Sequence, residues 1–265
     1  MNITCNAYGT SVGKETPNRD AFFCNPLKGF FGVFDGVGNL HNTEKASREA
    51  ARIFSNAAQQ LGSLERDDRY VKPWLCELMA TAHGQIKFTY SVGPHKAETT
   101  ATVMVVCADK DEPNIAVVNV GDSRLYGFNR KNQTVSRLTR DDSVVQQYPH
   151  FDDVEHENEL SPAELIIFTH MRRVISNAIG GPSYTAVGAN SYPIEGYDGF
   201  LLTTDGVHDN LTTKEIGQIV FSSGSEEETV KTLIESARNR SDRLDHLRSK
   251  PDDITAVYVT IGLEK

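Results

Sequence analysis

The chain is arranged around the sequence Gly29-Phe-Phe-Gly-Val-Phe-Asp35-Gly36-Val37-Gly38-Asn39. Four of its first six residues are large and apolar, which predicts a strand buried on both faces. An ionised carboxylate at the end of a buried strand is costly unless something compensates its charge. An isolated Asp-Gly pair is typical of a β-turn in which the aspartate bonds its own backbone. The Asp35-Gly36 pair, however, is not isolated.

Similar acidic endings occur at other places in the chain. The run Gly199-Phe-Leu-Leu-Thr-Thr-Asp205 is also followed by Gly-Val, and a third apolar run ends in Gly121-Asp122. Asp252-Asp253 stands immediately before the apolar run that begins at Ile254. The start of one strand lies beside the end of its antiparallel neighbour, so these acids are expected at one edge of a core. Ionised carboxylates can share a site only with a cation between them. The pattern therefore predicts a site for hard divalent metal ions.

Length and composition limit the class of protein. The chain has 265 residues, of which 38% are apolar, so a globular core is expected. Its net charge is −9 with no basic block, so nucleic acid is not an expected partner. The 4 cysteines are scattered without a C-x-x-C motif, which favours neither a zinc site nor a disulfide framework. No membrane span or signal peptide is recognisable. We expect a cytoplasmic monomer.

The order of the periodic segments predicts an α+β fold. Helical spacing of apolar residues predicts two helices after the first strands, and two capping-box patterns predict two more before the last strand. A meander of strands lies between them. This order favours antiparallel sheets covered by helices, and no linker divides the chain, so one domain over 1–265 is expected. The predicted strands are 3–8, 19–24, 29–35, 99–107, 114–120, 124–129, 134–138, 183–194, 199–204 and 254–261. The predicted helices are 43–61, 71–90 and those starting near Thr212-x-x-Glu215 and Ser225-x-x-Glu228.

The segment 141–167 is acidic and poorly periodic. We interpret it as a solvated acidic loop in preference to a dedicated metal site. A helix start is predicted within it at Ser161-Pro162.

Eight motifs, in this order, resemble the metal-dependent protein serine/threonine phosphatases of type 2C (PPM class). They are Asn18-Arg19-Asp20-Ala-Phe, Val33-Phe-Asp35-Gly36, Thr99-Thr100-Ala101, Val120-Gly121-Asp122-Ser123-Arg124, Leu138-Thr139-Arg140-Asp141, Ala178-Ile179-Gly180, Thr204-Asp205-Gly206-Val-His-Asp209 and Asp252-Asp253-Ile254-Thr255. The resemblance implies a four-layer α-β-β-α sandwich of two antiparallel sheets flanked by helices. It also implies a variable flap around 141–170 beside the site.

The resemblance also implies the roles of the acids. Asp35 matches the carboxylate that bridges two Mg²⁺ or Mn²⁺ ions, and the Gly36 carbonyl would bind one of them. Asp205 and Asp252 match the ligands of the other ion, and Asp20 matches an acid that binds the metals, often through their waters. Asp35, Asp205 and Asp252 are accordingly the predicted catalytic residues. A water or hydroxide between the metals would attack the phosphate.

A third metal ion is used by some members of that family. Asp122 and Asp209 match the acids that hold it together with Asp205. All of these predicted ligands bind through oxygen, and none is a cysteine or a histidine. Such ligands favour Mg²⁺ or Mn²⁺ over Zn²⁺.

The chain departs from the family pattern near its first acid. Arg19 stands where many members carry Glu, and Glu15 stands where many have a phosphate-binding Arg. We hypothesise that Arg19, or Lys14, supplies the missing positive charge to the substrate phosphate. The alternative is that Arg19 turns away from the site, because neighbouring strand residues face opposite ways.

Two further departures concern histidine. Val37 stands where some eukaryotic members have a histidine proposed as a general acid, so His208 is considered in its place, beside metal-bound water. Asp142 stands where histidine is frequent, a difference that the sequence does not explain.

The resemblance implies metal-dependent hydrolysis of phosphoserine and phosphothreonine in proteins, countering a serine/threonine kinase. The alternative is a catalytically weak relative that binds phosphoproteins or regulates a partner. Arg19 and Glu15 favour that alternative. The retained acids oppose it, and these are Asp20, Asp35, Asp205 and Asp252.

Overall fold

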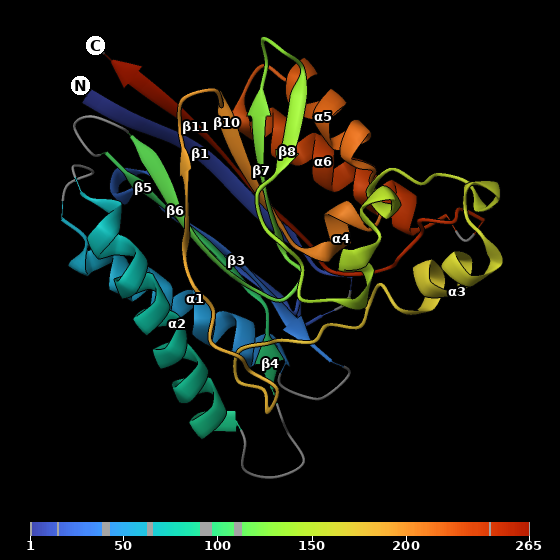
Figure 1. The fold of residues 1–265 in the computed structure, drawn as a ribbon, viewed down its shortest axis with the longest axis horizontal. Helices are drawn as coiled ribbons and strands as arrows, with labels where there is room; N and C mark the ends of the chain where they lie inside the picture. The colour runs from blue at the N-terminus through green and yellow to red at the C-terminus, as the bar shows by residue number, and fades with distance from the viewer. Residues whose placement is uncertain are drawn as a thin grey trace.

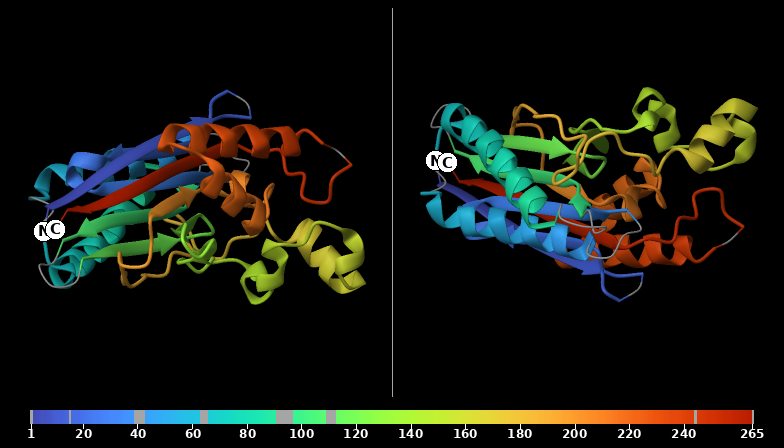
Figure 2. Two further views of the ribbon diagram at one scale, coloured as in Figure 1. Left: turned by 90° about the horizontal axis from the view of Figure 1, so that it is seen from above. Right: turned by 90° about the horizontal axis from the view of Figure 1, so that it is seen from below.

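Two β-sheets packed face to face form the centre of the computed structural model, and helices cover both outer sides (Figure 1). The structure describes residues 2–14, 16–38, 43–62, 66–90, 97–108, 113–243 and 245–264. The views in Figure 2 show the sheets as adjacent layers between the helices. This arrangement confirms the predicted α+β sandwich.

Both sheets are antiparallel along their described pairings. The first contains, in spatial order, β1 (Asn2–Val12), β11 (Ile254–Glu264), β10 (Gly199–Thr203), β7 (Arg124–Asn129) and β8 (Thr134–Arg137). The second contains β2 (Asp20–Asn25), β3 (Phe30–Val37), β5 (Ala101–Cys107), β6 (Asn114–Val120) and β9 (Asn190–Pro193), with the short β4 (Glu98–Thr99) paired to β3.

The α-helices lie outside the sheets or beside the flap. They are α1 (Thr43–Ala57), α2 (Asp68–Tyr90), α3 (Pro162–His170), α4 (Asp205–His208), α5 (Thr213–Ser222) and α6 (Glu226–Ser241). Short 3-10 turns are η1 (Pro26–Lys28), η2 (Ala58–Gln60), η3 (Val144–Gln147), η4 (Pro149–Asp152) and η5 (Glu157–Glu159). The expected capping boxes start α3 at Ser161 and α5 at Thr212, and the Ser225 hydroxyl caps α6. No helix in the described part of the chain is long and apolar enough to cross a membrane.

Strand β3 contributes to two apolar layers, which explains its nearly continuous apolar sequence. Phe30 and Phe34 point toward α1 and α2, whereas Phe31 and Val33 pack between the sheets. Side chains alternate across a strand, so a strand covered on both faces must be apolar at every position. A third layer packs β7, β10 and β11 against α5 and α6. Three apolar layers thus hold the four layers of elements together.

The flap is a compact structure, and the prediction of a solvated acidic loop over 141–167 was wrong. Phe151, Val154 and Phe168 form a small buried cluster of their own. Asp141 and Asp152 pair with the buried Arg124. These acids are therefore structural, while other acids of the segment remain exposed.

The predicted and observed strands differ most clearly at three places. β1 continues to Val12, beyond the predicted end at Tyr8, because its whole length pairs with β11. The run 99–107 is interrupted at Thr100, whose N–H donates to the Asp35 carbonyl at 2.9 Å. The expected strand 183–194 is reduced to β9.

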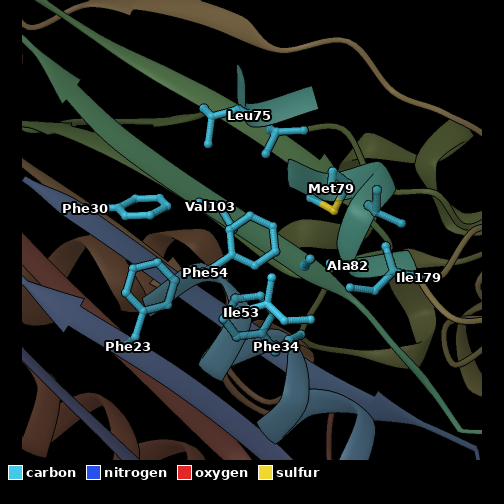
Figure 3. Close-up of a cluster of buried hydrophobic side chains, with 14 of the residues drawn as sticks. Phe23, Phe30, Phe34, Ile53, Phe54, Leu75, Met79, Ala82, Val103 and Ile179 are labelled. Carbon is cyan, nitrogen blue, oxygen red and sulfur yellow. The ribbon is translucent and has the colours of Figure 1, made fainter. Parts of the chain in front are cut away.

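A substitution in the aromatic cluster beneath α1 tests how much the first apolar layer stabilises the fold (Figure 3). Phe54 is fully buried, and its ring lies 5.5 Å from that of Phe34. We expect Phe54→Ala to lower the free energy of unfolding by about 3–5 kcal/mol, because it removes a buried ring and leaves a cavity. Urea denaturation measures this change. The matched control is Phe88→Ala at a side chain that is 86% exposed, where a similarly large loss would contradict the assignment.

Candidate active site

Strand ends from both sheets meet at one end of the sandwich. In the second sheet Asp20 pairs directly with Asp35, and in the first sheet the Thr204 N–H donates to the Thr255 carbonyl at 3.1 Å. The Thr204 and Thr255 hydroxyls both donate to Oδ2 of Asp20 at 2.7 Å. A buried carboxylate from one sheet is thus held by hydroxyls from the other.

A pocket of about 330 Å³ opens at this end. Acidic and basic side chains line it together, with part of the β3 backbone. Among the described residues, the acids are Asp35, Asp122, Asp205 and Asp252, and the basic residues are Lys14, Arg19, Arg173 and Lys250. Folding therefore gathers most of the predicted site residues around one cavity. Gly36 also lines it, whereas Asp20 is buried outside the lining and Asp209 lines a separate, smaller pocket.

The backbone of Asp35 is fixed by a pair of threonines. Its N–H donates to the Thr100 hydroxyl at 3.0 Å, and its carbonyl accepts from the Thr99 hydroxyl at 2.8 Å. A side chain on Gly36 would come within 2.7 Å of the Arg19 carbonyl, so only glycine allows this close approach. These contacts explain the Thr-Thr and Asp-Gly motifs.

Asp122 follows a tight turn at Gly121, which has φ of +95°. The Asp142 side chain accepts from the Gly121 N–H at 3.1 Å, and the Asp142 N–H donates to the Gly121 carbonyl at 2.9 Å. Asp142 therefore holds the turn that presents Asp122. This supplies the explanation that the sequence lacked for an aspartate at this position.

Asp205 begins the short helix α4 and has a lysine as its partner. Lys250 Nζ donates to Asp205 Oδ2, to Asp209 Oδ2 at 2.8 Å, and forms an ion pair with Asp252 Oδ2 at 3.4 Å. Burial alone would lower the pKa of Lys250, but these acids, Asp205 first, raise it well above its usual value. Sequence reasoning missed Lys250 because a single lysine before an acid pair carries no distinctive pattern.

Asp253 is a second residue that sequence reasoning left without a role. Its Oδ1 accepts from the Lys14 N–H at 2.7 Å and its Oδ2 from the Arg19 N–H at 2.8 Å. It therefore fixes the segment before β2. Its carbonyl also lies 1.9 Å from where a side chain on Gly206 would stand, so glycine is required there.

Arg19 turns toward the acids. Its Nη2 lies 3.4 Å from Asp252 Oδ1 and its Nε 3.4 Å from Asp253 Oδ2, with a third of the side chain exposed. Burial opposes its charge, but these carboxylates raise the pKa of Arg19. The alternative orientation away from the site is therefore wrong, while its contact with a phosphate stays a prediction. Glu15 lies outside the described residues.

His208 does not line the pocket. Its ring is buried, and its Nδ1 lies 3.0 Å from the Thr203 hydroxyl. Burial and the nearby Arg124 hold the pKa of His208 well below its usual value. A neutral, enclosed imidazole gives no support to the general-acid hypothesis.

The donor chemistry of one half of the pocket fits a hard cation. Burial, with repulsion from neighbouring acids, raises the pKa of Asp35 and Asp122 well above the usual value. Burial raises the pKa of Asp20 to about 8. Oδ1 of Asp20 is buried without a hydrogen-bond partner, as is Oδ1 of Asp205. Unpaired carboxylate oxygens in a dry site need a proton or a cation.

The whole cluster, however, is not arranged as a metal cage. Within the described ranges, no group of three or more acidic, histidine or cysteine side chains could hold a metal ion as they stand. On the side of Asp205, the ammonium of Lys250 occupies the space between the carboxylates. The two halves of the pocket therefore differ in how their negative charge is compensated.

The raised pKa of Asp20 predicts a pH-dependent stability. The pKa of Asp20 is about 8 in the folded chain, so the carboxyl keeps its proton up to that pH, whereas in the unfolded chain its pKa returns to the usual 3.8. Without metal, the free energy of unfolding should therefore fall as the pH rises between these values. Thermal unfolding in EDTA at about pH 5 and about pH 8 measures this fall. In Asp20→Asn the fall should be smaller, and an equal fall in both proteins would contradict the assignment.

Comparison with known proteins places the fold and the motifs in a family. A family model described as Protein phosphatase 2C matches residues 9–247. The serine/threonine phosphatase stp of Listeria welshimeri is 25% identical over 208 residues, 78% of this chain and 77% of that protein. The solved structure of Stp1 from Staphylococcus aureus has a TM-score of 0.77 at 19% identity, covering 100% of this chain and 96% of that one. The catalytic domain of PstP with 2 manganese ions has a TM-score of 0.72 at 19% identity, covering 98% and 99%. Because the family model matches most of its length, the chain belongs to the protein phosphatase 2C family.

Proposed function

We propose that this protein hydrolyses phosphoserine and phosphothreonine in other proteins and needs divalent cations, Mg²⁺ or Mn²⁺, to do so. The observation that supports this most directly is the pocket in which the partly exposed Asp35 and the buried Asp122 converge, neither of them in an ion pair among the described residues. Relatives named serine/threonine phosphatases support the substrate class, and the two manganese ions of the PstP structure support the metal. Opposition to a serine/threonine kinase, a monomeric state and a cytoplasmic location remain predictions from the sequence.

The residues around Asp35 would hold the cation. The Asp35 carboxylate and the Gly36 carbonyl line the pocket, and Asp20 lies beside them across the β2–β3 pairing. Bound divalent cations would neutralise the phosphate oxygens and lower the pKa of a water molecule. The threonine contacts to the Asp35 backbone keep its carboxylate in place, so little rearrangement would be needed on binding.

The basic residues at the pocket would orient the phosphate. Lys14 and Arg19 come from the segment before β2, and Arg173 follows the flap helix α3 on the other side. A phosphate dianion is repelled by a pocket of carboxylates alone, so these cations offset part of that repulsion. A guanidinium can also bind two phosphate oxygens at once.

A second candidate function is binding of phosphoproteins without turnover. The ion pairs of Arg19 with Asp252 and Asp253 favour this function. They occupy the guanidinium that is expected to contact the substrate phosphate. The two functions differ in whether a phosphopeptide is consumed when metal is bound.

Asp35→Asn tests the proposed hydrolysis. We expect Mn²⁺-dependent release of phosphate from a phosphothreonine peptide to fall at least about a hundredfold, because the cation loses a central carboxylate. Phosphate release and Mn²⁺ binding are measured on the same samples. Asp245→Asn, at an exposed position, is the matched control and should leave the rate unchanged.

The outcome for the wild-type chain separates the two functions. Phosphate release that requires Mn²⁺ supports hydrolysis. Bound Mn²⁺ and bound phosphopeptide without any release would instead support the binding function and reject the proposed one.

Arg19→Ala tests the role of the guanidinium. We expect KM for the phosphopeptide to rise up to about tenfold, because a charge-assisted contact to the phosphate is lost. Steady-state kinetics measure KM and kcat separately. Arg48→Ala removes a nearby exposed guanidinium that does not line the pocket and serves as control. Unchanged kinetics in Arg19→Ala would remove the hypothesis.

A further inference from the structure

Lys250 is buried, although a lysine is usually found at the protein surface. Its side chain is 1% exposed, and lysine is almost never buried completely without a partner. Its ammonium contacts Asp205, Asp209 and Asp252, which we call the Lys250 triad. An ammonium has three N–H donors. Two of them bond to Asp205 and Asp209, and Asp252 lies at ion-pair distance.

The backbone of Lys250 is fixed as firmly as its ammonium. The Lys250 N–H donates to Asn210 Oδ1 at 2.9 Å, and Asn210 Nδ2 donates to the Lys250 carbonyl at 2.9 Å. Asn210 is itself fully buried and follows α4, the helix that carries Asp205. The lysine is therefore anchored at both ends to the segment whose acids it neutralises.

The other half of the pocket has no such cation. Asp20, Asp35 and Asp122, which we call the Asp35 group, form no ion pair with a basic side chain among the described residues. Two of the three come from the second sheet's β2–β3 pairing, and the third follows β6. The Asp35 group thus has oxygen donors for a divalent ion and, in the described part of the chain, no ion pair of its own, and only longer-range attraction from Lys250 and Arg19 acts on Asp122 and Asp35.

A divalent ion and an ammonium would compete for the Lys250 triad. Both are attracted by the same carboxylates, but they repel each other strongly when they lie a few ångströms apart in a buried site. The triad therefore does not fit a divalent ion while Lys250 is in place. The ammonium neutralises part of the carboxylate charge and occupies the space between the three side chains.

We propose that the Lys250 ammonium is the resident cation of the Lys250 triad and takes the place of a divalent ion there. The chain then binds divalent metal only at the Asp35 group, and its positive charge on the other side comes from the protein itself. Because Lys250 also lines the pocket, this fixed charge borders the space for the substrate phosphate. This inference rests on the proposed function, which requires a divalent cation. It changes the number of divalent ions expected to bind per chain.

Counting bound Mn²⁺ tests the assignment. Lys250→Met keeps a side chain of similar length and removes its charge. Electron paramagnetic resonance of free Mn²⁺ at neutral pH gives the number of ions bound per chain. We expect Lys250→Met to bind about one ion more than the wild-type chain, because three carboxylates become available. Lys231→Met, at a lysine whose side chain is 61% exposed and paired with Glu227, is the control and should match the wild type.

Thermal unfolding supplies a second readout that does not depend on activity. Lys250→Met leaves the triad without a cation, so it should unfold at a lower temperature in EDTA and gain more from Mn²⁺ than the wild type does. Equal ion counts and equal dissociation constants for the wild type and Lys250→Met would overturn the proposal. So would a Lys250→Met chain that stays unfolded in Mn²⁺, since the added ion should replace the lost charge.

The number of bound Mn²⁺ ions and the hydrolysis assay test the two proposals separately. A wild-type chain that releases no phosphate would reject the proposed function, while the difference in bound Mn²⁺ would still show what Lys250 does. A chain that hydrolyses phosphopeptide but binds the same number of ions with and without Lys250 would reject only this inference.

Discussion

Buried carboxylates repel one another at one end of the two sheets, and the fold has to hold them together against that repulsion. Burial and neighbouring acids raise the pKa of Asp35 and Asp122, which is the electrostatic signature of that crowding. Removal of charged groups from water costs free energy, so stability must come from elsewhere. The three apolar layers, extending along the sheets away from the pocket, supply it. Hydroxyls such as those of Thr204 and Thr255 relieve part of the cost locally.

Much of the fold could be predicted because its sequence patterns agree with its burial. The run at β3 is apolar at successive positions because the strand is covered on both faces, and the capping residues Ser161 and Thr212 start helices where expected. The flap could not be predicted in the same way. Its cluster of Phe151 and Phe168 is assembled from apolar residues scattered among acids, without a helical or strand period.

The gathering of the acids could be anticipated from their places at strand ends, because antiparallel pairing sets those ends side by side. Lys250, Asp253 and Asp142 could not. Each acts through contacts with residues distant in the sequence, as when Asp253 accepts from the N–H groups of Lys14 and Arg19. No spacing of residues within a short stretch of sequence predicts such contacts. The charge balance of a buried site is a property of the tertiary structure, and single basic residues decide it.

Two buried arginines, Arg172 and Arg248, connect the flap to the segment beside the acidic pocket. Arg248 Nη1 donates to the flap carbonyls of Phe151 and Val154 at 2.9 and 3.1 Å, and its Nη2 donates to the Leu211 carbonyl at 3.2 Å, beyond α4. Arg172, just after α3, donates to the Asp209 carbonyl at 3.2 Å. Withdrawal of the flap would remove both carbonyl partners of Arg248 Nη1, which is costly for a buried donor. The flap is therefore held by buried hydrogen bonds to the segment that carries Asp209.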